Sequence, residues 1–180
     1  MPYRNILFFL VFFLTAYVEA APLQTEAELK AIERAHSTAI EIKSDYRRSL
    51  GEAMSKGTME KALPGCRVTT KHPGEVVVGR TSHRLRNPKN VAPDWAKSYL
   101  EKFSRAKAKD IPKNVLVKID SQRNGYLEPI FVEPICLNCH GSQLSPGVQE
   151  VLQKEYPHDQ AVGFKAGDFR GLLWLEMKEK

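Results

Sequence analysis

Apolar side chains recur at helical spacing over residues 25–55 of the chain. The positions that keep this rhythm are Leu29, Ile32, Ala35, Ala39, Ile42, Tyr46, Leu50 and Met54. A repeat of about 3.6 residues puts such side chains on one face of a helix, and charged residues fill much of the remaining surface. Thr25 and Glu28 have the spacing of a capping box, and Gly57 follows as a helix-ending residue. The pattern predicts one long amphipathic helix from Thr25 to about Ser55.

Three shorter segments also have helical patterns. Residues 59–63 form the first, which stops at Pro64 because proline cannot continue a helix. Residues 93–107 form the second, whose apolar stripe consists of Trp95, Tyr99, Leu100 and Phe103. Residues 145–156 form the third, in which Ser145 is placed to cap the helix and Pro146 to occupy its first position.

In four places the hydrophobic pattern is that of a β-strand rather than a helix. The predicted strands are residues 75–78, 115–119, 126–132 and 169–177. The second and third are separated by residues 120–125, which end in Asn124-Gly125, a strong signal for a hairpin turn. Helices packed outside an antiparallel sheet define the α+β class. We therefore expect an α+β domain, with the segment after residue 132 at a sheet edge.

Residues 1–20 have the features of a secretory signal peptide. Arg4 is followed by an apolar run, and small residues precede a cleavage point after Ala20. The run is shorter than the roughly twenty residues of a spanning helix, which disfavours the alternative of an uncleaved membrane anchor. We expect an exported, periplasmic protein without stable membrane insertion after cleavage. Residues 21–180 are then expected to form a single domain.

The charge balance narrows the choice of partners. The 180 residues include 27 Lys and Arg against 21 Asp and Glu, a net charge of +6. A basic surface suits an acidic redox partner or an anionic membrane surface. Because the leader predicts export, no nucleic acid partner is expected.

The strongest chemical signal is the run Cys136-Leu137-Asn138-Cys139-His140. It reads C-x-x-C-H, the attachment signature of a c-type haem. Two cysteines three residues apart lie one helical turn apart, so both thiols can bond to vinyl groups of one porphyrin. His140 would then supply the proximal iron ligand, with its second ring nitrogen held by a backbone carbonyl or a water. The motif predicts one covalently bound haem c.

Two other chemistries use a C-x-x-C pair. A thioredoxin-like redox disulfide needs a βαβ context, which the pattern around residue 136 lacks. A zinc site needs two further ligands in a similar knuckle, which the chain does not offer. Haem attachment uses two of the three cysteines and leaves Cys66, which is then a dimer bridge, a free buried thiol or a metal ligand.

Hydrogen-bond donors gather in residues 80–88. Guanidinium groups bind carboxylates through paired hydrogen bonds, so this segment is a candidate for holding the haem propionates. The candidate residues are Arg80, Thr81, Arg84 and Arg86. The alternative is a solvated basic loop.

Several short segments of the sequence together resemble one known family. They are Gly79 to Ser82, Arg86 to Pro88, Ala92 to Trp95, Tyr126 to Pro129, Pro134 to Gly141, Tyr156-Pro157, Asp159 to Ala161, Gly163, and Lys165 to Gly171. The chain is similar to exported c-type haem proteins with a PAS-like fold, long catalogued as a domain of unknown function. The same domain serves as a sensor module in some bacterial histidine kinases and chemoreceptors. The resemblance implies a PAS-like antiparallel sheet with a long N-terminal helix, flanking helices and one covalent haem.

The resemblance also bears on the sixth iron ligand, because a cysteine in the upstream helical region is typical of the family. Cys66 is the natural candidate, although Pro64 and Gly65 precede it where a continuing helix is expected. A thiolate on iron would lower the reduction potential. The other candidates are His72, His83, His158 and Met54, and a vacant position is the remaining alternative.

Two functions fit a small exported haem protein. The first is a redox or ligand sensor module, in which ligand exchange at iron changes the surface seen by a signalling partner. The second is a small electron-transfer cytochrome with a redox partner. A haem enzyme would need an acid-base residue, for which His72 and His83 are the candidates, and no catalytic activity is expected. The length of the first helix also leads us to expect a homodimer.

Overall fold

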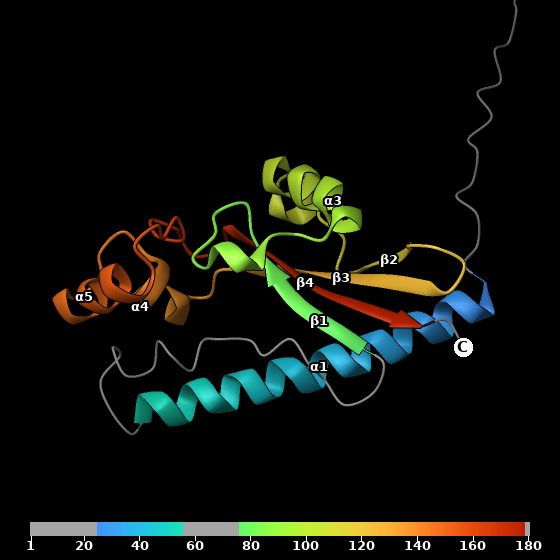
Figure 1. Cartoon of the computed structure of the whole chain (residues 1–180), viewed down its shortest axis with the longest axis horizontal. Coiled ribbons are helices and arrows are strands. Elements are labelled where there is room, and N and C mark those ends of the chain that lie inside the picture. The colour runs from blue at the N-terminus through green and yellow to red at the C-terminus, as the bar shows by residue number, and fades with distance from the viewer. Residues whose placement is uncertain (1–24, 56–75, 179–180) are drawn as a thin grey trace, which may run out of the picture.

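β3 and β4 form the centre of an antiparallel sheet. The structure is a computed structural model that describes residues 25–55 and 76–178 (Figure 1). Within these residues the strands are β1 (Val76–Thr81), β2 (Val115–Lys118), β3 (Arg123–Phe131) and β4 (Phe169–Lys178), in the order β1-β4-β3-β2. The α-helices are α1 (Glu26–Ser55), α3 (Asp94–Arg105), α4 (Leu137–His140) and α5 (Pro146–Glu155). Short 3-10 helices lie between them: η2 (Pro88–Asn90), η3 (Ala108–Asp110) and η4 (Pro134–Cys136).

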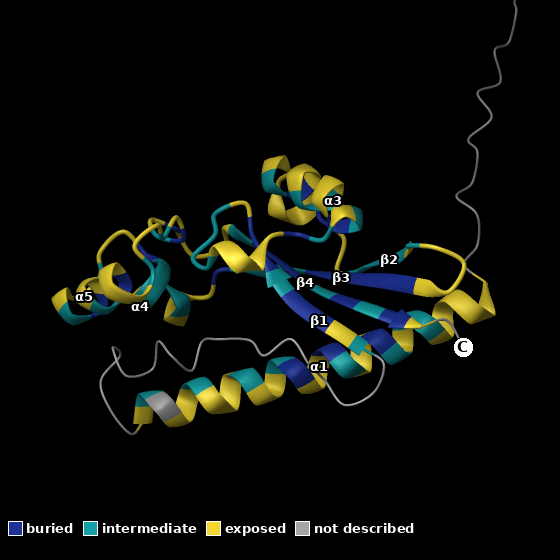
Figure 2. Cartoon of the chain, viewed as in Figure 1, coloured by how far each residue is buried: buried dark blue, intermediate teal, exposed yellow. Residues whose placement is uncertain are grey.

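α1 lies along one face of the sheet. Its capping box is formed, because Thr25 Oγ1 accepts the Glu28 N–H at 3.2 Å and the Glu28 carboxylate accepts the Thr25 N–H at 2.8 Å. The apolar stripe packs on the strands, and Figure 2 shows the buried positions along this side of the helix. The shared cluster consists of Ala35, Ala39, Ile42, Val78, Tyr126, Leu173, Leu175 and Met177. The predicted amphipathic helix is confirmed.

A buried carboxylate also links α1 to β3. Glu128 is 6% exposed and accepts hydrogen bonds from Tyr126 Oη at 2.7 Å and from Lys43 Nζ. The Nδ1 atom of His36 lies 2.8 Å from the same carboxylate. Burial alone would raise the pKa of Glu128, but the hydrogen bonds of Lys43, Tyr126 and His36 outweigh it and lower that pKa. Glu128 therefore holds α1 against the sheet in its charged form.

α3 covers the opposite face of the sheet. Successive strand residues point to opposite faces, so Leu127 and Leu172 face away from α1. They pack with α3 and its flanking segments in a cluster of Ala92, Ala96, Phe103, Ile111, Leu127 and Leu172. Trp95 Nε1 fixes the start of the helix by donating to Glu176 of β4 at 2.7 Å. The sheet is thus covered on both faces.

The turn between β2 and β3 differs from the prediction. Residues 119–122 make the turn, and Asn124 pairs with Lys118 inside the sheet. Gly125 lies against the indole of Trp95, where a Cβ atom would come within 2.7 Å of the ring. The prediction of an Asn124-Gly125 turn is wrong: both residues pair within the sheet, and Asp120 forms the turn with its Oδ1 accepting the Gln122 N–H at 2.9 Å.

α4 and α5 lie beyond the end of the sheet (Figure 1). β3, an inner strand of the sheet, leads to α4 through η4, so the C-x-x-C-H run follows the end of a strand as predicted. α5 begins as predicted, with Pro146 at its first position and Ser145 Oγ accepting the Val148 N–H at 3.3 Å. The α+β class, with an antiparallel sheet and a long N-terminal helix, is confirmed.

Two predicted segments lie outside the described residues. They are the leader at residues 1–20 and the short helix at residues 59–63. In the part of the chain that is described, the helices are too short or too polar to cross a membrane.

Candidate functional site

Residues 134–140 form one helical turn that runs from η4 into α4. Pro134 occupies the first position of η4, where its missing N–H is not needed. Cys136 has helical angles at the junction, with φ −66° and ψ −26°, so Cys136 and Cys139 lie one turn apart as predicted. Both cysteine side chains are partly buried. The Cys136 side chain packs against the cluster of Val132, Ala161 and Phe164, and that of Cys139 against the cluster of Val148 and Leu152.

His140, at the end of α4, is held by a backbone carbonyl. Its Nδ1 atom lies 2.6 Å from the carbonyl oxygen of Ala161. Because a carbonyl only accepts, Nδ1 carries the proton and the lone pair lies on Nε2. Burial, together with the charges of Arg86 and Arg170, lowers the pKa of His140 to about 3. The imidazole is therefore neutral near pH 7, which is the form that binds metals.

Arg86 ties α4 to the segment that holds His140. Its Nε donates to Asp159 Oδ2 at 3.0 Å, and its Nη2 donates to the carbonyls of Cys139 and Ala161. The second oxygen of Asp159 accepts the Ala161 N–H at 2.7 Å. The Arg86 and Asp159 side chains are 10% and 8% exposed, so this is a buried ion pair. The sequence predicts that Arg86 binds a haem propionate. In the structure, two of its three guanidinium nitrogens donate instead to acceptors within the protein.

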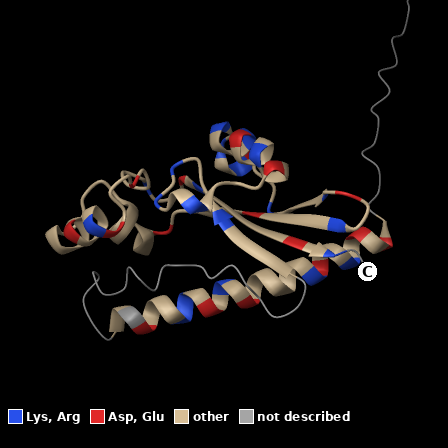
Figure 3. Cartoon of the chain, viewed as in Figure 1, with Lys and Arg blue, Asp and Glu red and all other residues tan. Residues whose placement is uncertain are grey.

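Further guanidinium groups lie near the end of β1, where Figure 3 shows basic residues gathered. The Arg84 and Arg170 guanidinium carbons lie 4.1 Å and 5.2 Å from the centroid of the Phe164 ring. That of Arg80 lies 4.6 Å from the ring centroid of Tyr46 in α1. Such contacts are favourable for a cation and hold these side chains in place. The structure thus brings the predicted arginines to one region.

Thr81 is buried at the point where β1 meets the start of β4. Its Oγ1 has no hydrogen-bond partner among the described residues. The strands approach closely here, since a Cβ atom on Gly171 would lie 2.0 Å from the Thr81 carbonyl oxygen. Gly171 also has φ +151°, a conformation that favours glycine. Thr81 is therefore fixed beside the arginine region, with an unused donor.

The second half of α1 borders the same region. Arg47 donates to Glu133, the residue before η4, at 3.1 Å, and Arg80 stacks on Tyr46 one residue earlier in the helix. Cys66 and His72, which follow α1 in the sequence, lie outside the described residues.

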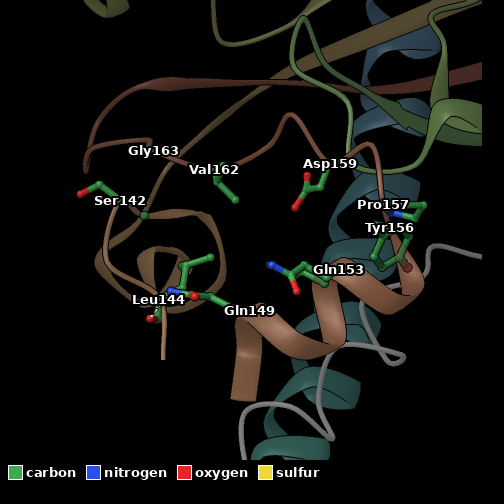
Figure 4. Close-up of a pocket in the computed structure, with 11 residues that line it drawn as sticks. Ser142, Leu144, Gln149, Gln153, Tyr156, Pro157, Asp159, Val162 and Gly163 are labelled. Carbon is green, nitrogen blue, oxygen red and sulfur yellow. Dashed lines mark hydrogen bonds between the residues drawn. The ribbon is translucent and has the colours of Figure 1, made fainter. Parts of the chain in front are cut away.

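A cavity of about 510 Å³ opens between α5 and the loop that follows it. Figure 4 shows Gln149 and Gln153 of α5 around this opening, with Val162 and Asp159 of the loop across from them. The lining begins at Gly141, directly after the C-x-x-C-H run. There is thus open space beside residues 136–140, which we call the attachment turn.

This donor set fits a c-type haem. Two thiols one turn apart match two vinyl groups, and a neutral imidazole with its lone pair on Nε2 matches the iron. The guanidinium groups match two carboxylates. Among residues 25–55 and 76–178, no group of three or more His, Cys, Asp or Glu side chains is arranged to hold a metal ion, so a zinc site is not formed there.

A comparison with protein-family models decides the family. The Tll0287-like model matches residues 20–177. The chain belongs to the Tll0287-like family. Among solved structures it is similar to the crystal structure of the cyanobacterial heme-protein Tll0287, with a TM-score of 0.55 and 18% identity over 87% of this chain and 98% of that one. These matches confirm the predicted family and fold, and no curated protein matches the sequence.

The other described candidates for the iron ligand of this Tll0287-like chain, His83, His158 and Met54, are exposed or only partly buried. His83 stacks on Phe169, with ring centroids 5.9 Å apart. His158 is exposed in the loop after α5, and Met54 is partly buried in the last turn of α1. None of the described candidates has a contact that marks it as the sixth ligand, so Cys66 stays a prediction.

Three contributors to the Tll0287-like site were missed by sequence reasoning: Asp159, the Ala161 carbonyl and Arg170. Asp159 to Ala161 and Lys165 to Gly171 are among the segments that carry the family resemblance, which was the available signal. Each also contacts a residue far along the chain, such as the contact of Ala161 with His140, 21 positions earlier. Local patterns do not report such contacts.

Proposed function

We propose that this Tll0287-like protein binds one haem c, attached to Cys136 and Cys139 and ligated by His140. The family match and the heme-protein neighbour support haem binding. The C-x-x-C-H turn supports covalent attachment. Bound haem would supply an iron centre that changes oxidation state and exchanges ligands.

One observation carries this proposal: the hydrogen bond between His140 Nδ1 and the Ala161 carbonyl. It fixes the tautomer and the orientation of the ring, which is the usual role of a partner to a metal-bound histidine. Phe164 supports the ring from the side, with centroids 6.3 Å apart in an edge-to-face contact. The chain therefore holds the imidazole ready for iron.

We infer a sensing role, in which a change at the iron alters the surface presented to a signalling protein. α1 is the element best placed to report such a change, because Tyr46 and Arg47 contact the site while Glu128 binds the same helix to the sheet. Cys66, a short distance beyond α1 in the sequence, remains the proposed sixth ligand. The protein's own residues then bind and orient the group without performing catalysis.

Electron transfer is the second candidate function. The attachment turn lies at the surface, since Ile135 is 50% exposed beside Cys136. Exposure at that point would let a redox partner approach the haem edge. For either function we propose export to the periplasm after cleavage of residues 1–20 and an association with another protein or with a second copy.

Absorption spectra test the proposal and separate the two functions. The mature protein is measured oxidised, reduced and reduced with carbon monoxide, alongside Cys66→Ser and the control His158→Gln. A sensing role predicts a ferric thiolate-type spectrum that only Cys66→Ser abolishes, and binding of carbon monoxide by the reduced wild type. Identical six-coordinate spectra without gas binding in all three proteins would favour electron transfer. Absence of any haem spectrum would contradict both.

A further inference from the structure

Four guanidinium groups share one region with few carboxylates. Arg80 comes from β1, Arg170 from β4, and Arg84 and Arg86 from the loop after β1. Asp159 is the carboxylate that pairs with Arg86. Its two oxygens already accept from Arg86 Nε at 3.0 Å and from the Ala161 N–H at 2.7 Å. Within residues 25–55 and 76–178, neither Arg84 nor Arg170 forms an ion pair, so their two positive charges have no carboxylate partner there.

The backbone holds two of these arginines together. The Ser82 hydroxyl donates to the Arg170 carbonyl at 2.6 Å and accepts the Arg84 N–H at 3.0 Å. The Arg170 side chain in turn donates from Nη1 to the Arg84 carbonyl at 3.3 Å. The arrangement is built where β1 pairs with the start of β4 and does not depend on exposed, freely rotating side chains.

Arg84 and Arg170 differ in how many of their guanidinium donors are already used. Arg84 donates from Nε to the Gln160 carbonyl at 3.0 Å and stacks closely on Phe164. Within residues 25–55 and 76–178, the Nε and Nη2 atoms of Arg170 have no hydrogen-bond partner. Burial, and then the charges of Arg80 and Arg86, lower the pKa of Arg170 to about 10. The Nε and Nη2 atoms are not fully buried, so an anion can reach them and pair with the guanidinium group.

We propose that Arg170 binds the haem propionates through these unused donors, while Arg86 positions the attachment turn. The inference rests on the proposed haem site at His140. Carboxylates are the matching chemistry, because a guanidinium fork donates two parallel hydrogen bonds to a carboxylate. Phe164 lies between the two residues, because its ring centroid is 5.2 Å from the Arg170 guanidinium carbon and 6.3 Å from the centroid of the His140 ring.

Haem and its dimethyl ester provide the direct test, because the ester lacks the carboxylates but keeps the iron. The full mature chain with Cys136→Ser and Cys139→Ser is used, so that both forms bind without covalent attachment. Dissociation constants are measured by absorption titration in this background, in Arg170→Gln and in Arg170→Lys. Arg105→Gln is the matched control, because Arg105 pairs with Glu101 on the exposed side of α3.

We expect the background chain and the Arg105→Gln control to bind haem about tenfold more tightly than the ester, the size of one charge-assisted hydrogen bond. Arg170→Gln should bind both forms equally, and Arg170→Lys should lose most of the preference because a lysine has no fork. A full preference in Arg170→Gln, or in Arg170→Lys should the glutamine variant not fold, overturns the inference. Equal binding of both forms by the background chain also overturns it. Failure of the background chain to bind either form contradicts the haem site itself.

Discussion

The Nδ1 atom of His140 lies 2.6 Å from the carbonyl oxygen of Ala161, and this bond is one of three between α4 and the loop after α5. The Phe164 N–H donates to the His140 carbonyl at 2.9 Å, and the Gly163 N–H donates to the Gly141 carbonyl at 2.8 Å. Backbone and side chain of the predicted iron ligand are thus fixed by the same segment. The site is preorganised by the protein's own hydrogen bonds.

Asp159→Asn should destabilise the protein, because it removes the charge that pairs with buried Arg86. We expect a loss of roughly 3 kcal/mol in the free energy of unfolding, the usual cost of leaving one partner of a buried pair alone. Urea unfolding followed by circular dichroism measures it. Glu101→Gln is the control, since it removes an exposed pair worth less than about 1 kcal/mol. Equal effects of the two variants would contradict a structural role for the Arg86–Asp159 pair.

Gly171→Ala should be strongly destabilising. A Cβ atom there would lie 2.0 Å from the Thr81 carbonyl oxygen, which belongs to backbone and cannot rotate away. We expect a loss of at least about 2 kcal/mol in the free energy of unfolding. In Gly51→Ala nothing lies within 4 Å of the new Cβ, and the exposed position in α1 should gain up to roughly 1 kcal/mol. A neutral Gly171→Ala in thermal unfolding would refute the close β1–β4 contact.

Glu128 should make stability depend on pH in the acid range. Its pKa is lowered in the folded state below the ordinary value of 4.5, because the hydrogen bonds of Lys43, Tyr126 and His36 outweigh its burial. As the pH falls below 4.5, the unfolded chain takes up the proton first, so the stability present above that pH is lost.

Glu128→Gln should lower the free energy of unfolding near neutral pH by roughly 1 to 3 kcal/mol and flatten its fall in acid. Urea unfolding at a series of pH values measures both effects. Asp45→Asn, which removes an exposed pair with Arg48, should leave the acid slope unchanged. An unaltered slope in Glu128→Gln would mean that another group causes the acid sensitivity.

Local patterns predicted the elements that local forces determine. The capping box of Thr25 and Glu28 and the Ser145 cap are contacts between residues three positions apart, and both formed as predicted. The Asn124-Gly125 signal failed because Asp120 forms the turn earlier in the chain, with its carboxylate accepting from the Gln122 N–H at 2.9 Å and from Arg123 Nε at 2.8 Å. Gly125 instead lies within β3, where Trp95 packs closely on it.

The sequence identified the candidate haem-binding residues, but it did not predict which residues the arginines of the site contact. Cys136, Cys139 and His140 are recognisable because their spacing is itself the signal. The role of Arg86 depends on Asp159, 73 positions later, and Arg170 joins the region only because β4 pairs with β1 in the sheet. The cluster of arginines in residues 80–88 suggests a site for carboxylates, but the sequence alone does not tell which arginine binds a carboxylate and which pairs within the protein.

Covalent attachment of haem is the central claim, and intact-mass spectrometry of the denatured protein tests it most directly. The mature protein is produced in the periplasm of a host with a c-type maturation system, next to the Cys136→Ser, Cys139→Ser double variant. The account predicts that the wild-type polypeptide carries the mass of one haem after extraction with acidified acetone, and that the double variant carries none. A wild-type chain with the mass of the polypeptide alone would contradict the account. The same added mass on the wild type and on the double variant would also contradict it.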